Sequence, residues 1–116
     1  MLFNKNKSIK IKLVNSDYAP DSFDKQLPIE CELIRMIPGK DRPDYWIAKS
    51  NKTLTYEKYK INYLIVATRF VGWKIKKEMK ATLLGVAYVL DESVIYDDIL
   101  DFDKCKYIAI STGIEI

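Results

Sequence analysis

The chain has 116 residues, of which 48% are hydrophobic and 30% are charged, and its formal net charge is +3. This composition excludes a disordered chain, because enough apolar surface can be buried to offset the entropy of ordering. The sequence contains no histidine, which excludes Ser-His-Asp and Cys-His catalysis and every zinc site that needs a histidine ligand. At this length we expect one globular domain over residues 1–116.

The charges are segregated along the chain. Residues 1–16 carry +4, residues 17–48 carry −3, residues 49–80 carry +7 and residues 81–116 carry −5. Such separation of sign is typical of two parts of a fold that attract each other, or of a surface that meets a charged partner. The charge pattern therefore bears on how the protein associates with partners, and not on whether it catalyses a reaction.

The first half of the chain predicts short strands joined by turns. Ile9, Ile11 and Leu13 alternate with lysines, which is the pattern of a strand with one solvent face. Residues 15–28 are rich in Asn, Asp, Ser and Pro and predict a loop. Further along, we expect a strand over 29–37 with a bulge where the alternation breaks, a turn over 38–44, a short strand over 45–49 and a turn at 51–52.

The second half predicts strands that are covered on both sides. Residues 59–70, 83–90 and 107–112 are apolar on both faces. Two short helices are expected between them, over 73–80 and from Asp91 through Leu100, the latter with Ile95 and Ile99 facing inward. The segment that joins 83–90 to 106–112 is long enough for a crossover, which predicts that these two strands are parallel neighbours.

Two short helices cannot cover this many doubly apolar strands. The sheet must therefore fold over on itself or bury one face against a partner. We predict an α+β fold dominated by strands, with about six strands in a strongly bent, mostly antiparallel sheet or half-barrel and one or two short helices late in the chain. An all-β sandwich or barrel is the alternative.

The sequence also bears on location and on the state of the cysteines. Its N-terminal residues include no apolar run of the length that a secretory signal needs, and no run approaches the length of a membrane-spanning helix. We expect a cytoplasmic protein that does not contact a membrane. In that compartment Cys31 and Cys105, which lie in apolar stretches, are expected to be buried thiols rather than a disulfide.

No motif predicts catalysis or a cofactor. The four glycines are too dispersed to form a phosphate-binding loop. Asp97, Asp98, Asp101 and Asp103 form an acidic cluster, and a helix would place Asp97 and Asp101 on one face. A solvated acidic surface near a helix end is favoured over a Mg²⁺ site. We therefore predict neither an enzyme nor a metal centre.

Two groups of residues predict contact with a partner. One is a lysine-rich helix face over 73–80 with aromatic residues nearby, and the other is the segment 91–103, which contains no basic residue. Small bacterial inhibitors and immunity proteins, which block a toxin or an enzyme with a charged and aromatic surface, have this general character. The candidate partner-binding residues are Tyr45, Trp46, Trp73, Lys74, Lys76, Lys77, Lys80, Asp97, Asp98 and Asp101.

The predicted function is that of a non-enzymatic protein-interaction module, of the inhibitor or immunity type, with a homodimer as a further possibility. One alternative is a β-domain that binds single-stranded nucleic acid, because lysines neutralise phosphates and aromatic rings stack on unpaired bases. Another is a small-ligand-binding barrel with a cavity lined by Tyr63, Tyr88 and Tyr107.

Overall fold

The structure is a computed structural model that describes residues 9–17, 19–68, 70–72, 84–109 and 111–115. Strands dominate these residues, and the helices are short. The strands are β1 (Ile9–Asp17), β2 (Ile29–Ile37), β3 (Tyr45–Tyr56), β4 (Tyr59–Thr68), β5 (Leu84–Val89), β6 (Cys105–Ala109) and β7 (Ser111–Glu115). The helices are α1 (Asp21–Asp24) and the 3₁₀-helices η2 (Glu92–Tyr96) and η3 (Phe102–Lys104).

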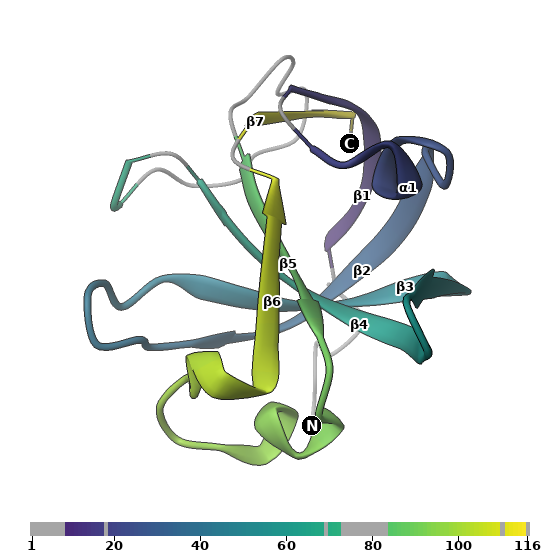
Figure 1. Cartoon of the computed structure of the whole chain (residues 1–116). Coiled ribbons are helices and arrows are strands. Elements are labelled where there is room, and N and C mark those ends of the chain that lie inside the picture. The colour runs from purple at the N-terminus through teal and green to yellow at the C-terminus, as the bar shows by residue number, and fades with distance from the viewer. Residues whose placement is uncertain (1–8, 18, 69, 73–83, 110, 116) are drawn as a thin grey trace, which may run out of the picture.

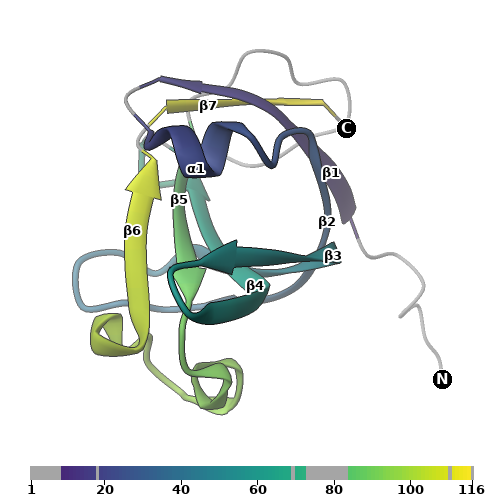
Figure 2. The ribbon, with the colours of Figure 1, turned by 45° about the vertical axis from the view of Figure 1, so that its right-hand side comes forward.

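All seven strands belong to one antiparallel sheet with the order β6-β5-β4-β3-β2-β1-β7. Figure 1 shows β5 and β6 side by side, and Figure 2 shows the sheet curling so that β1 and β7 come round towards β5 and β6. The two edge strands follow each other in the chain, yet no ladder joins them among the residues that the structure describes. The predicted strand-dominated, strongly bent, mostly antiparallel sheet is confirmed.

The concave face of the sheet encloses the larger of two hydrophobic clusters. Each of the first six strands contributes to it, and Phe23 of α1 closes one end. There the ring of Tyr88 packs edge-on against Phe23, with ring centroids 6.1 Å apart. Gln26 donates a hydrogen bond to the Tyr88 hydroxyl (3.3 Å) and accepts one from the backbone N–H of Thr55 (2.8 Å). The interior of the curl is therefore filled with side chains.

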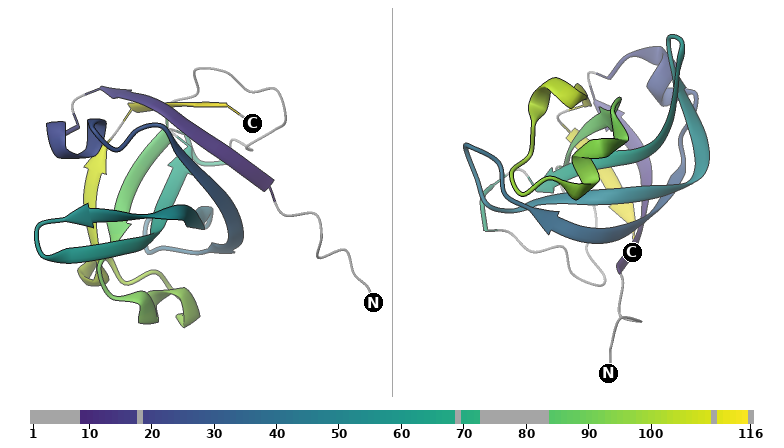
Figure 3. Two further views of the ribbon diagram at one scale, coloured as in Figure 1. Left: turned by 90° about the vertical axis from the view of Figure 1, so that its right-hand side faces the viewer. Right: turned by 90° about the horizontal axis from the view of Figure 1, so that it is seen from below.

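The convex face carries the second cluster, which explains why the central strands are apolar on both sides. Ile47, Ile65, Ala87 and Val89 project from β3, β4 and β5 on this face. The segment that contains η2 and η3 covers them, and Figure 3 shows it lying across the sheet when the molecule is seen from below. The expectation that strands 59–70 and 83–90 are covered on both sides is thus correct. It is wrong for the last strand, because Tyr107 is mostly exposed.

The strand 29–37 and its bulge are as predicted. Alternate residues from Ile29 to Leu33 are buried, and the register with β3 shifts between Leu33 and Arg35. β3 is longer than expected, because residues 51–56 continue the strand instead of turning at 51–52. Between the pairs Lys49–Tyr63 and Leu54–Ile61 the register shifts. The hairpin turn lies at Glu57, which has φ of 53°.

The connection between β5 and β6 also differs from the prediction. β5 and β6 pair in antiparallel register, so the expected parallel crossover is wrong. Asp91 does cap a helix, accepting a hydrogen bond from the Ser93 N–H, but η2 is a 3₁₀-helix that ends at Tyr96. The α-helix that the described residues contain, α1, is early in the chain, in a stretch that the sequence predicts as loop. The helix expected over 73–80 lies outside the described residues.

No helix among the described residues has the length and apolar character that a membrane crossing requires.

Candidate interaction surface

The segment 91–104, called the acidic loop below, connects β5 to β6 and contains η2 and η3. Six of its residues are acidic and one is basic, so that it carries a net charge of −5. The charged residues are Asp91, Glu92, Asp97, Asp98, Asp101, Asp103 and Lys104.

Two buried side chains attach the acidic loop to the convex face of the sheet. Val94 and Leu100 are almost completely inaccessible and belong to the second hydrophobic cluster. The backbone N–H of Leu100 also donates a hydrogen bond of 2.8 Å to the carbonyl of Pro38, which follows β2. Burying a Leu side chain contributes about 2 kcal/mol, so these contacts hold the loop in one place.

Polar contacts fix the backbone of the acidic loop on both sides of its buried anchors. The carboxylates of Asp91 and Asp101 accept hydrogen bonds of 3.0 Å from the backbone N–H groups of Ser93 and Asp103. The first of these lowers the pKa of Asp91. Lys104 Nζ lies 2.9 Å from Asp97 Oδ2, and this contact raises the pKa of Lys104. These contacts orient the loop, but they neutralise only one of its carboxylates.

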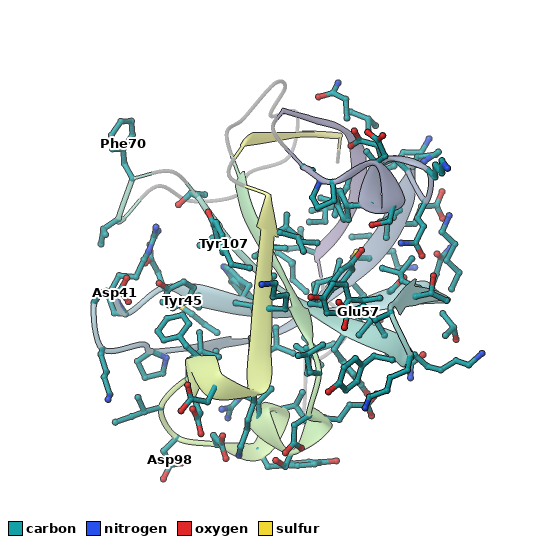
Figure 4. The ribbon with its side chains drawn as sticks, viewed as in Figure 1. Asp41, Tyr45, Glu57, Phe70, Asp98 and Tyr107 are labelled. Atoms are coloured by element: carbon teal, nitrogen blue, oxygen red, sulfur yellow. The ribbon has the colours of Figure 1, made fainter. Side chains whose placement is uncertain are left out.

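The side chains that the acidic loop exposes to solvent are apolar and acidic. Tyr96 is 82% exposed and Ile99 is 57% exposed, although both are large and hydrophobic. Asp98, between them, is exposed as well, and Figure 4 shows it at the periphery of the molecule. Interfaces combine a centre of aromatic and aliphatic anchors with a polar rim. The acidic loop exposes both kinds of side chain.

A second network lies beside the acidic loop and is structural. Arg42, in the turn between β2 and β3, forms a bidentate ion pair with Asp44 at 2.6 and 3.0 Å. Arg42 also donates to the carbonyl and hydroxyl oxygens of Thr68 (2.6 and 3.1 Å), and Asp44 accepts from the Gly72 N–H (2.8 Å). The side chains of Arg42 and Asp44 are only 10% and 13% exposed. This pair therefore joins the β2–β3 turn to the end of β4.

Tyr45 links this network to the acidic loop. Its ring packs edge-on against Phe102, with centroids 5.4 Å apart, and lies 5.6 Å from the Arg42 guanidinium. Its hydroxyl is 2.9 Å from both carboxylate oxygens of Asp41, and burial together with this carboxylate raises the pKa of Tyr45 to about 12. Any β-carbon on Gly39 would lie 2.5 Å from the Tyr45 ring. The ring therefore has a fixed position.

The structure separates the two aromatic candidates in β3. Tyr45 lies on the convex face beside the acidic loop, whereas Trp46 is partly buried against the concave-face cluster. Both side chains are half-buried, and strand alternation places them on opposite faces of β3. Contact of Trp46 with a partner stays a prediction.

The acidic candidates come together in the acidic loop but have different roles. Asp97 pairs with Lys104, and its backbone carbonyl accepts a hydrogen bond from Arg35. Asp101 caps η3, and Asp98 faces solvent. Asp97 and Asp101 do not share a helix face as predicted, because the chain between them is not helical. In the part of the chain that is described, no group of three or more potential ligand side chains could hold a metal ion.

The lysine-rich face predicted over 73–80 lies outside the described residues. The residues concerned are Trp73, Lys74, Lys76, Lys77 and Lys80.

The three tyrosines proposed to line a ligand cavity lie in different places. Tyr88 is buried in the concave-face cluster, and Tyr63 packs against the convex-face cluster. Tyr107 is exposed on β6, where its hydroxyl would be 3.0 Å from a β-carbon on Gly85. Tyr107 therefore covers the strand at Gly85. These side chains do not form one cavity.

Both cysteines are free, as the sequence predicts. Cys31 is buried in the concave face and Cys105 is half-buried. Burial raises the pKa of each thiol to about 12, so neither is a reactive thiolate near neutral pH.

Sequence reasoning missed Tyr96 and the exposure of Ile99. A helix of 3.6 residues per turn from Asp91 places Ile95 and Ile99 inward together. Ile95 does pack, half-buried, against the convex-face cluster, but Ile99 is exposed, and Val94 and Leu100 are the fully buried residues of the loop. The signal that was available is the position of Tyr96 and Ile99 among four closely spaced aspartates.

No protein-family model, no curated protein and no solved structure matches this chain.

Proposed function

We propose that this protein is a non-enzymatic, cytoplasmic protein-interaction module that binds another protein through the acidic loop. The observation that carries the proposal is the combination of a rigidly held backbone with exposed apolar side chains. Tyr96 and Ile99 are displayed from a segment that two buried residues and several hydrogen bonds fix in place. A surface that is already ordered loses little conformational entropy on binding.

The charge of the loop defines the chemistry of the partner. With a net charge of −5 over 91–104, the loop attracts a positively charged protein surface and repels acidic ones. Such steering accelerates association and is strongest at low ionic strength. The partner would meet the aromatic and aliphatic centre with its own apolar groups and the aspartates with lysine or arginine side chains.

An inhibitor or immunity protein is the specific kind of module that we favour. These proteins need no chemistry of their own, only a fixed surface that complements a target. A second copy of this chain is an alternative occupant of the surface, and binding to single-stranded nucleic acid is the alternative for the lysine-rich segment over 73–80.

Truncation of the displayed side chains tests the proposal. We expect the double variant Tyr96→Ala, Ile99→Ala to lose at least about tenfold in affinity for the partner, because exposed aromatic anchors contribute most of the energy of an interface. The measurement is affinity capture from cells that make the protein, followed by titration of the captured protein in a calorimeter.

Lys106→Ala is the matched control, because Lys106 is exposed on β6 outside the acidic loop. The same protein should be captured by the wild type and by this control. Equal affinity of all three forms for the captured protein would contradict the proposed surface. Sedimentation that shows a dimer lost in the double variant would identify a second copy as the occupant.

A further inference from the structure

The outer surface of the sheet is hollowed beside the part of β3 and β4 that the acidic loop covers. A shallow hollow of about 620 Å³ lies over β1, β2 and β3, and a second of about 370 Å³ lies over β3 and β4. Both include Lys49, Ser50 and Asn51 of β3, so they are neighbours. The first is lined by Lys10, Ile11, Lys12, Glu30, Cys31, Glu32, Lys49, Ser50 and Asn51. The second adds Lys52, Thr53, Asn62, Tyr63 and Glu92.

The irregular part of β3 lies where the two hollows meet. The register of β3 with β4 shifts between Lys49 and Leu54. The side chain of Ser50 is buried and folds back on its own strand, donating a hydrogen bond of 2.7 Å to the carbonyl of Lys52. Bulges bend a strand and re-aim its side chains, and they are frequent beside binding sites.

Amines and carboxylates alternate along the lining. Lys10 pairs in register with Glu32, which pairs with Lys49, and Lys12 pairs with Glu30 in the neighbouring row. None of these pairs forms an ion pair within 4.0 Å among the described residues. Apart from the Glu30 oxygen that accepts a hydrogen bond from Asn51, their amines and carboxylates are therefore available to a ligand.

Amides and a tyrosine complete the surface. Asn51 donates to Glu30 and Asn62 donates to Glu92, each at 3.0 Å, which orients both amides. Tyr63 is half-buried in the same lining and provides the aromatic side chain. Oriented amides beside an aromatic ring offer both hydrogen bonds and an apolar contact.

The interleaved charges select the charge of the ligand. Four lysines and three glutamates line the two hollows, so an anionic ligand meets carboxylates and a cationic ligand meets amines. A neutral polyhydroxylated ligand avoids both repulsions, because each hydroxyl can accept from an amine or an amide and donate to a carboxylate. We infer that this surface binds a neutral oligosaccharide, as a second binding function beside that of the acidic loop, which contributes only Glu92.

Lys49 is the residue to replace, because it is exposed and lines both hollows. The probes are maltotriose, cellotriose and chitotriose at millimolar concentration, with a heparin-derived tetrasaccharide as the anionic arm. The readout is the position of amide signals in ¹H–¹⁵N NMR spectra during titration. We expect saturable shifts around residues 30–32, 49–53 and 62–63 with at least one neutral probe.

Lys49→Ala should weaken that binding by about 3- to 10-fold, the effect of losing one hydrogen bond. Lys106→Ala, an exposed lysine on another strand, should leave it unchanged. Absence of saturable shifts with all three neutral probes, shifts confined to another surface, or tighter binding of the anionic tetrasaccharide would each overturn the inference. Equal affinities of Lys49→Ala and Lys106→Ala would overturn it as well.

Discussion

Replacement of Leu100 by alanine should lower the free energy of unfolding by about 2 to 5 kcal/mol, the cost of removing a buried leucine side chain and leaving a cavity. Leu100 is almost completely buried on the convex face, and its N–H is bonded to the Pro38 carbonyl. Because this residue anchors the acidic loop, the same substitution should also weaken partner binding. Urea denaturation followed by circular dichroism measures the first effect.

Ile99→Ala is the matched control, since Ile99 is the adjacent residue and is largely exposed. We expect it to change the unfolding free energy by less than about 0.5 kcal/mol. The helical interpretation of the sequence, with Ile99 inward, predicts the reverse order. A larger loss for Ile99→Ala than for Leu100→Ala would therefore contradict the structure of the acidic loop.

Asp44→Asn should cost about 3 kcal/mol, because it removes the charge of one partner in an ion pair that is largely buried. Arg42 would keep its charge without a carboxylate, and the contacts that join the β2–β3 turn to Thr68 and Gly72 would weaken. Asp41→Asn is the control. Asp41 is exposed and accepts from the Tyr45 hydroxyl, so its loss should cost no more than about 1 kcal/mol.

The same pair adds a pH dependence to stability. The hydrogen bond from Arg42 lowers the pKa of Asp44 below its usual value near 3.8. A carboxyl group with a lowered pKa in the folded state binds fewer protons than in the unfolded state, so it stabilises the fold above that usual value. This contribution is lost as the pH falls through the folded-state pKa. The unfolding free energy of the Asp44→Asn variant should therefore not show this decrease at acidic pH. If the unfolding free energies of the wild type and the variant changed with pH in parallel, the assignment would be contradicted.

The strands were predictable wherever burial followed strict alternation. Residues 29–33 alternate cleanly, and the observed strand and its bulge match the prediction. The continuation of β3 beyond Lys49 was not predictable, because a strand that bulges presents the same polar residues as a turn. Ser50 illustrates the ambiguity, since its hydroxyl bonds to its own strand.

The candidate site was predictable in charge but not in geometry. The acidic segment 91–103 and the cap at Asp91 follow from residue types. Which apolar residues point outward depends on whether the segment is α-helical or 3₁₀, and 3.6 and 3.0 residues per turn bury different positions. The Arg42–Asp44 pair depends on Thr68 and Gly72, which are distant in sequence, so no local pattern indicates it.

The central claim, that a protein partner binds the acidic loop, is tested most directly by crosslinking. A photoreactive phenylalanine derivative would replace Tyr96 in one variant and Glu57 in another, since Glu57 is exposed in the β3–β4 turn, away from Asp98 in Figure 4. We predict that, after irradiation in cells, the Tyr96 variant forms a covalent adduct with one other protein that the Glu57 variant does not form. Adducts of equal yield at both positions, or an adduct at Glu57 alone, would contradict the account.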